Sequence, residues 1–144
     1  MRTMLFLTIL CFLSCGTDQG ETKTYIYTVK NESGVSIKLK GYKNNINTAP
    51  TIIQLENNQE LTKTFKDGLP PRGPYGFSDF FQSDSLIVLF NNNKKIVYLW
   101  ESRCENGNDR NPLNSCFHSN NEVETFIFSV EDYDYWLNLT SKGA

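Results

Sequence analysis

Side chains able to act as a nucleophile, a general acid or a general base are few in this sequence. His118 is the only histidine, and a Ser–His–Asp relay needs a serine and a carboxylate beside the imidazole. Ser115 and Ser119 lie close to it in the chain, but neither stands in the strand-to-helix motif that exposes a nucleophilic serine. We therefore interpret His118 as a solvated surface residue.

Paired carboxylates offer a second chemistry, the acid–base hydrolysis carried out by glycosidases. Asp79 and Asp84 form one group, and Glu131, Asp132 and Asp134 form another. Structural roles explain both groups: the first flanks an expected strand, and the second lies at an expected helix start, where acids interact favourably with the helix dipole. The sequence favours a protein that is not an enzyme, with a carboxylate-dependent hydrolase as an alternative.

The segment 70–77 is the candidate binding loop. It combines prolines, which stiffen the backbone, with a cation at Arg72 and aromatic rings at Tyr75 and Phe77. Arginine and rigid aromatic side chains dominate the energetics of protein interfaces. The alternative is a crossover between two sheets, in which Tyr75 and Phe77 pack inward.

Cys104 and Cys116 flank a loop without a strand pattern. In an exported protein a disulfide between them would close that loop and add about 3 kcal/mol on the chain-entropy model. Two cysteines and one histidine do not complete a tetrahedral metal site, and the spacing is not the C-x-x-C of redox motifs. We expect a structural disulfide, no metal and no cofactor.

The same loop carries oxygen ligands of the kind that calcium accepts. They are Glu105, Asn106, Asn108, Asp109 and Asn111. Their order does not match an EF-hand loop, so the sequence leaves calcium binding open against a solvated loop.

Residues 1–14 have the anatomy of an export signal. Arg2 precedes an apolar run from Met4 to Leu13, which is shorter than the roughly 20 residues of a membrane-spanning helix. The chain turns polar after Cys15. The junction Phe12-Leu13-Ser14-Cys15-Gly16 resembles the lipobox of bacterial lipoproteins, in which small residues and a cysteine end the apolar run.

The resemblance implies that Cys15 receives the lipid and becomes the mature N-terminus, and that residues 15–23 form a tether. It also implies a location in the cell envelope, anchored to the outer membrane, because Gly16 rather than Asp follows the cysteine. Ordinary secretion is the alternative, since Ser14 and Gly16 also fit a conventional cut after Gly16 that would discard Cys15.

Length and composition limit the domain that follows. A chain of 144 residues predicts one domain, here residues 24–140. Its hydrophobic content of 39% and aromatic content of 13% exclude a fully disordered chain. The net charge of −2 argues against a nucleic-acid partner and against a polybasic membrane patch.

Alternation of apolar and polar residues predicts a mainly β fold of about seven strands. The expected strands are 25–29, 35–40, 51–55, 61–65, 86–90, 96–100 and 125–130. Turn residues between the first three pairs predict three hairpins, and two-sided apolar character predicts that the third pair is central and 125–130 buried. Ser129 and Asp132 resemble a helix-capping pair, so a short helix over 131–139 should close an antiparallel β-sandwich or open barrel.

The sequence thus predicts a lipid-anchored envelope protein with a non-catalytic binding or accessory role. The expected partner is a protein, as for an inhibitor or immunity protein, or another envelope component. A small-ligand carrier with an internal cavity is the first alternative, and the hydrolase is the second.

Overall fold

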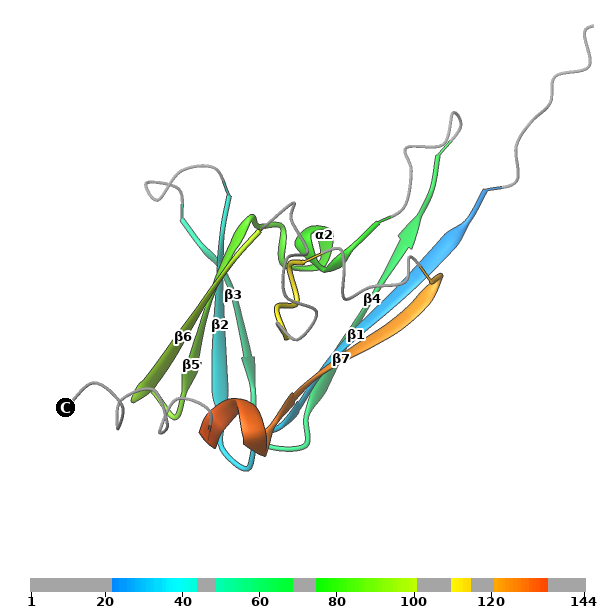
Figure 1. Ribbon diagram of the computed structural model, residues 1–144. Coiled ribbons are helices and arrows are strands. Elements are labelled where there is room, and N and C mark those ends of the chain that lie inside the picture. The colour runs from blue at the N-terminus through cyan, green and yellow to red at the C-terminus, as the bar shows by residue number, and fades with distance from the viewer. Residues whose placement is uncertain (1–21, 44–48, 69–74, 101–109, 115–120, 135–144) are drawn as a thin grey trace, which may run out of the picture.

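The computed structural model describes residues 22–43, 49–68, 75–100, 110–114 and 121–134 of the 144 (Figure 1). Within these ranges seven strands form two sheets: β1 (Thr24–Glu32), β2 (Ile37–Tyr42), β3 (Thr51–Leu55), β4 (Glu60–Lys66), β5 (Ser85–Phe90), β6 (Lys94–Leu99) and β7 (Val123–Ser129). All seven predicted strands are present.

The two sheets face each other as a wedge. Sheet A has the strand order β4-β1-β7 and sheet B the order β3-β2-β5-β6. Figure 1 shows the sheets close together where β1 leads to β2 and further apart at the other end, where helix α2 (Phe77–Phe81) lies. The prediction of a mainly β sandwich with a short C-terminal helix is confirmed. Pairing is antiparallel except between β1 and β7, which run parallel.

Aromatic side chains fill the space between the sheets. Ring contacts run without a break from α2 to the C-terminal helix, with neighbouring centroids 5.0 to 6.4 Å apart. The series is Phe81, Phe80, Phe77, Phe126, Phe128, Phe90 and Tyr133. Tilted and edge-on pairs at these distances add attraction beyond the area they bury. The core therefore extends along the whole wedge.

Two of the three predicted hairpins are wrong. β1 and β2 lie in different sheets, and so do β3 and β4. β1 already pairs on one side with β4 and on the other with β7, so it has no free edge for β2. The turn residues between these strands carry the chain across the wedge instead. Gly34 has φ +82°, a conformation that glycine adopts without strain. The third hairpin, β5 with β6, is confirmed.

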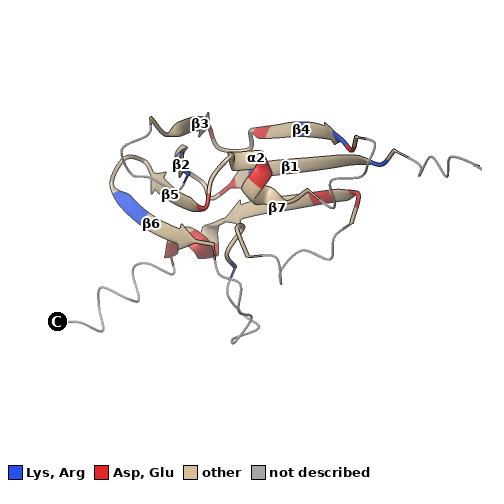
Figure 2. Cartoon of the chain, turned by 90° about the horizontal axis from the view of Figure 1, so that it is seen from above, with Lys and Arg blue, Asp and Glu red and all other residues tan. Residues whose placement is uncertain are grey.

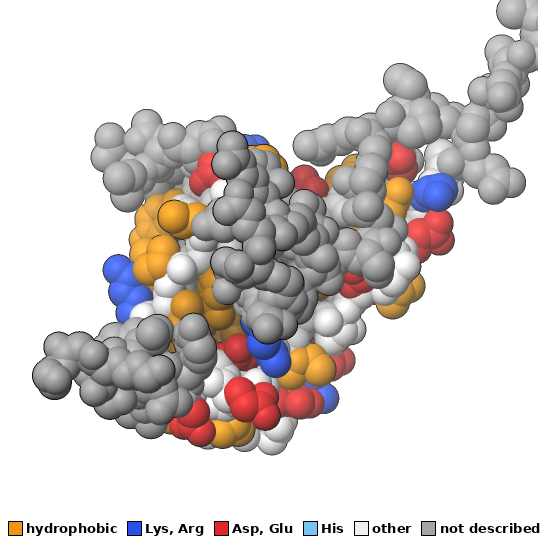
Figure 3. All heavy atoms as spheres, viewed as in Figure 1, with side chains coloured by type: hydrophobic (Ala, Val, Ile, Leu, Met, Phe, Trp, Pro, Cys, Tyr) orange, Lys and Arg blue, Asp and Glu red, His pale blue; other side chains and the backbone are white. Residues whose placement is uncertain are grey.

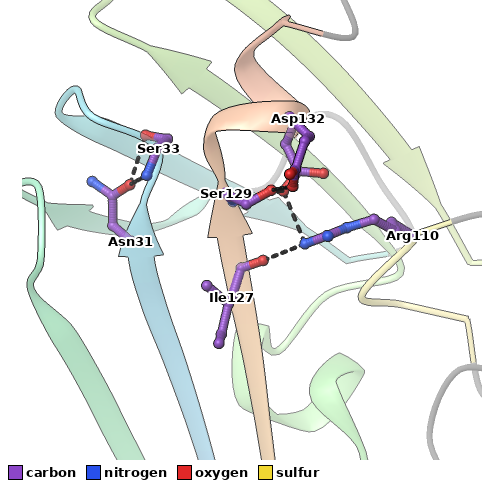
Figure 4. Close-up of polar contacts among 7 residues, drawn as sticks. Asn31, Ser33, Arg110, Ile127, Ser129 and Asp132 are labelled. Carbon is purple, nitrogen blue, oxygen red and sulfur yellow. Dashed lines mark hydrogen bonds and ion pairs between the residues drawn. The ribbon is translucent and has the colours of Figure 1, made fainter.

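A buried asparagine joins the segments at the narrow end of the wedge. Asn31 is fully buried, and its side-chain nitrogen donates to the carbonyl oxygens of Val35 (2.7 Å) and Leu55 (3.0 Å). Its side-chain oxygen accepts from the backbone N–H (3.1 Å) and hydroxyl (2.7 Å) of Ser33 (Figure 4). All four hydrogen-bonding positions of this amide are used. One side chain from sheet A thus fixes both the approach to β2 and the end of β3.

Strands β6 and β7 are less buried than predicted. β6 lies at the edge of sheet B, and Val97 and Leu99 on it are 50% and 54% exposed. On β7, Phe126 and Phe128 are buried while Val123 and Ile127 are exposed. The prediction that these strands are covered on both faces is therefore wrong, because each sheet packs on one face only.

The C-terminal helix begins where the sequence indicated. Residues 130–134 are helical, and residues 135–139 of the expected helix lie outside the described residues. The Asp132 carboxylate accepts from the Ser129 backbone N–H at 2.8 Å and from Arg110 at 3.1 Å (Figure 4). Arg110 also donates to the carbonyl oxygen of Ile127 at 2.6 Å. These bonds fasten the helix start, the end of β7 and segment 110–114 together.

Among the residues described, no helix has the length and apolar character needed to cross a membrane.

Replacing Asn31 with Ala should lower the free energy of unfolding by about 3 kcal/mol, because several buried groups lose a partner at about 1 to 3 kcal/mol each. Asn57→Ala is the matched control: the Asn57 side-chain oxygen accepts one exposed bond, from the Gly34 N–H at 2.9 Å, and its loss should cost less than about 1 kcal/mol. Urea unfolding of both variants measures the difference. Equal losses would contradict the central role of Asn31.

Candidate functional site

A cleft of about 620 Å³ opens beside α2, at the wide end of the wedge. Its described walls are formed by four uncharged polar, three aromatic, two acidic and one basic side chain. The described residues that line it are Lys43, Thr51, Phe65, Tyr75, Ser78, Asp79, Gln82, Ser83, Asp84 and Trp100. They come from both sheets and from the α2 segment, so the sandwich itself determines their positions.

Helix α2 forms the middle of this site. Gly76 precedes the helix, and its N–H donates to the Asp79 carboxylate at 3.1 Å. The helix ends at Gln82, whose φ of 52° is left-handed. Phe77, Phe80 and Phe81 are all buried, so the apolar side of the helix is anchored in the core and its polar side faces the cleft. The sequence pattern predicted no helix in this segment.

The chain after α2 lies directly on the backbone of β2. A Cβ atom at Gly41 would lie 2.8 Å from the carbonyl oxygen of Phe81 and 2.9 Å from the Cβ of Ser83. Real Cβ atoms do not approach neighbours this closely, so the packing requires glycine. This contact sets the position of Ser83 in the cleft wall.

Ser83 carries an unsatisfied hydroxyl. The residue is 5% exposed, and its hydroxyl oxygen has no hydrogen-bond partner among the described residues. Buried polar groups are nearly always paired, so such a group calls for an explanation. The oxygen itself has almost no accessible surface and lies against the backbone at Gly41, so it belongs to the packing behind the cleft wall.

Lys63 ties α2 to sheet A. It points inward from β4, and its Nζ donates to the carbonyl oxygen of Phe80 at 2.6 Å and lies 4.8 Å from the centre of the Phe80 ring. Burial lowers the pKa of Lys63, because the charged form loses hydration. The amine thus binds the C-terminal end of the helix, where backbone carbonyls are unpaired.

The predicted binding loop is only partly represented in this site. Tyr75 lines the cleft: its ring stacks on Phe65 with centroids 4.9 Å apart, and its hydroxyl donates to the carbonyl oxygen of Lys66 at 3.2 Å. Phe77 is 1% exposed and belongs to the core, so it has no surface to offer a partner. Arg72 lies outside the described residues.

The two carboxylate groups separate in space. Asp79 and Asp84 both line the cleft. Asp132 is 6% exposed and caps the C-terminal helix, and Asp134 is exposed on that helix; neither lines the cleft. The second group therefore has the structural role that the sequence suggested for it.

Other candidate residues fall elsewhere. Asn111, a possible calcium ligand, is 9% exposed; its side-chain nitrogen donates to the carbonyl oxygen of Leu99 at 2.7 Å and its side-chain oxygen accepts from the Leu113 N–H at 2.9 Å. The described residues hold no group of three His, Cys, Asp or Glu side chains placed to share a metal ion. Several sequence candidates lie outside the described residues: Cys15, Cys104, Glu105, Asn106, Asn108, Asp109, Cys116 and His118.

Trp100 is one of the cleft residues that sequence reasoning missed, together with Phe65 and Ser83. It directly follows β6 and is 52% exposed, and its backbone N–H donates to the carbonyl oxygen of Asp84 at 2.8 Å. The pattern placed it inside a buried strand. A large aromatic residue at the last position of a strand, next to a loop, was the available signal.

No family model, curated protein or solved structure matches this chain significantly.

The Tyr27 hydroxyl is hydrogen-bonded to the backbone of the cleft residue Tyr75. It donates to the carbonyl oxygen of Tyr75 at 2.7 Å, linking β1 to the residue that stacks on Phe65. Burial, with a smaller effect of the Glu124 charge, raises the pKa of Tyr27 to about 12. The folded state therefore holds this proton more tightly than the unfolded state, whose tyrosines have a pKa of about 10. Its contribution to stability is complete below about pH 10 and is lost as the pH rises towards 12.

Tyr27→Phe should lower the free energy of unfolding by about 1 kcal/mol near pH 8, because the Tyr75 carbonyl loses its donor. The variant should also lose less stability than the wild type between about pH 10 and 12, since it lacks the shifted phenol. Urea unfolding across this pH range measures both effects. Parallel pH curves for the two proteins would show that Tyr27 titrates normally.

Proposed function

We propose that this protein is a lipid-anchored binding module of the bacterial cell envelope that captures a partner or ligand in the α2 cleft without chemical turnover. The anchor is Cys15, and its support is the resemblance of the Phe12–Gly16 junction to a lipobox. An outer-membrane location follows from Gly16 in the same motif.

The observation that carries the binding proposal is the composition of the cleft wall. Exposed aromatic surface at Trp100 lies in the same hollow as the carboxylates of Asp79 and Asp84. Binding sites commonly combine apolar walls with a few placed polar groups. The wall rests on a packed core, so little ordering would be needed on binding.

The chemistry of the wall favours a ligand with a flat apolar part and several hydrogen-bond donors. Aromatic rings bind flat apolar groups, and carboxylates accept from N–H or O–H donors. An exposed segment of a protein partner meets this description, as for an inhibitor or immunity protein, and so does a polar envelope component.

The carrier alternative is less well supported than the cleft. A carrier of the expected kind would enclose its ligand in the middle of the sandwich, where the described aromatic rings contact one another instead. The space available to a ligand lies at the wide end, beside α2.

A carboxylate hydrolase remains the second candidate because Asp79 and Asp84 line one cleft. Asp79 also accepts from the Gly76 N–H, which gives it a structural role. Hydrolytic turnover by the wild type that Asp84→Asn abolishes, with the fold intact, would overturn the binding proposal.

Trp100→Ala should weaken capture of the partner from solubilised envelopes about tenfold or more, the loss typical of a central aromatic anchor. The free energy of unfolding should fall by about 1 to 3 kcal/mol, because about half of this large side chain is buried, and the fold should remain intact. Val123→Ala, which removes a 65% exposed side chain from β7, is the control and should leave capture unchanged. Quantitative mass spectrometry measures the amount of partner that each variant captures. Equal amounts for both variants would contradict binding in the cleft.

Cys15→Ala should abolish lipidation and move the protein from the membrane fraction to the soluble fraction or leave it as precursor. Several acyl chains hold a protein to a membrane far more firmly than one does. Intact-mass measurement and membrane fractionation test this. A wild-type protein that carries no lipid mass and leaves membranes in salt alone would exclude the anchor.

A further inference from the structure

Sheet B has an outward face that combines lysines with exposed aliphatic side chains. Along each strand of sheet B, alternate residues such as Leu39 and Val88 point inward and are buried. The residues that alternate with them along the strand therefore point outward. We define the basic face by Lys38, Lys40, Lys95, Ile52, Val97 and Leu99. The three aliphatic residues are 57%, 50% and 54% exposed in that order. Figure 3 shows hydrophobic side chains gathered over β6 with a lysine beside them.

The strand register places these residues together. Lys40 pairs with Ile52 on one side and with Ile87 on the other, and Ile87 pairs with Val97. In the neighbouring row Lys38 pairs with Leu89, which pairs with Lys95. Lysines of β2 and β6 therefore lie next to aliphatic side chains of β3, β5 and β6 rather than in a separate patch.

Charge is distributed unequally between the two sheets. The four strands of sheet B contain four lysines and no acid, although the chain as a whole has 16 acidic and 14 basic side chains. The strands of sheet A carry three acids, Glu32, Glu60 and Glu124, and three lysines, so they have no net charge (Figure 2). The net charge of the chain averages over both sheets and so hides the basic face.

We propose that the basic face rests on the anionic phospholipid surface of the membrane that holds the protein. Lysines are attracted to anionic headgroups, and their aliphatic stems, like the exposed Ile, Val and Leu side chains, can enter the interfacial region. An acid-free face of lysines and aliphatic groups matches such a surface in both charge and polarity.

This inference rests on the proposed lipid anchor at Cys15, which would keep the domain close to the membrane surface. The tether from Cys15 to Thr24 spans at most about 30 Å when extended, so the domain stays close to the bilayer. β1 begins at Thr24, at the wide end of the wedge, where the sheets are further apart than the roughly 10 Å of closely stacked sheets. The tether must therefore be largely extended when sheet B faces the membrane. Weak surface contacts count under these conditions because the effective concentration is high.

Lysine acetylation of the lipidated protein tests the orientation, because both sheets carry outward lysines. The protein is reconstituted in vesicles of phosphatidylglycerol with phosphatidylcholine, or of phosphatidylcholine alone. Lys38, Lys40 and Lys95 should react at least about fivefold more slowly in the anionic vesicles, since one lysine alone contributes about that factor in affinity. Lys30 and Lys66 on sheet A are internal controls and should react equally in both. High salt should restore the rates.

Flotation of the same samples separates this inference from the anchor. Protein that floats with both vesicles yet shows no slower labelling of the basic face overturns the inference and leaves the anchor standing. Protein that floats only with anionic vesicles indicates that the anchor fails while the face binds. Slow labelling without vesicles that depends on protein concentration would assign the face to a second copy, and would also overturn the inference. In the double variant Lys40→Glu and Lys95→Glu, the remaining lysine of the face, Lys38, should react at the same rate in both kinds of vesicle. The variant should still float with both kinds of vesicle.

Discussion

The two sheets are held together by the unbroken series of aromatic contacts that runs from Phe81 in α2 to Tyr133 in the C-terminal helix. The remaining structure depends on this packing, because each sheet has one apolar face that only the other sheet and the short helices cover. Phe77 and Phe126 meet at 6.0 Å in the middle of the series and join the α2 segment to sheet A. At the narrow end Asn31 satisfies buried backbone groups that the rings cannot. At the wide end the sheets diverge, and α2 fills only part of the opening.

The cleft follows from that geometry. Phe77, Phe80 and Phe81 hold α2 in the core, Lys63 and Tyr27 bind the backbone at its two ends, and Gly41 lets the following chain settle on β2. The polar side of α2 is therefore exposed in the cleft, together with Trp100. A rigid scaffold that displays recognition groups on connecting segments is a common arrangement in binding proteins. The basic face lies on the outside of sheet B, so capture in the cleft and contact with a membrane would use different surfaces.

Period-two alternation predicted the first four strands, because each sheet buries one face and the alternation shows which one. The last three strands were predicted from apolar runs, which located the strands but overstated the burial of β6 and β7. It did not predict which strands pair. The turn at Asn31–Gly34 has the same residue types in a hairpin as in a crossover, and only the contacts of β1 with β4 and β7 decide between them. Helix α2 was not predicted, because five residues are too few to show the periodicity of a helix. The cleft escaped as well: Trp100, Ser83 and Phe65 stand far apart in the chain, and only the meeting of the two sheets brings them together. Cys15, Cys104 and Cys116 lie outside the described residues, so lipidation and the disulfide are still predictions from the sequence alone.

The claim at the centre of this account is that the α2 cleft binds a molecule of the envelope. The most direct measurement places a photo-crosslinking amino acid at Ser78, in the cleft wall, and compares it in living cells with the same amino acid at Thr64, on the outward face of sheet A. The account predicts a discrete adduct of one mass from position 78 and none from position 64, with the position-78 adduct reduced by Trp100→Ala. Adducts from both positions, or from position 64 alone, would contradict it.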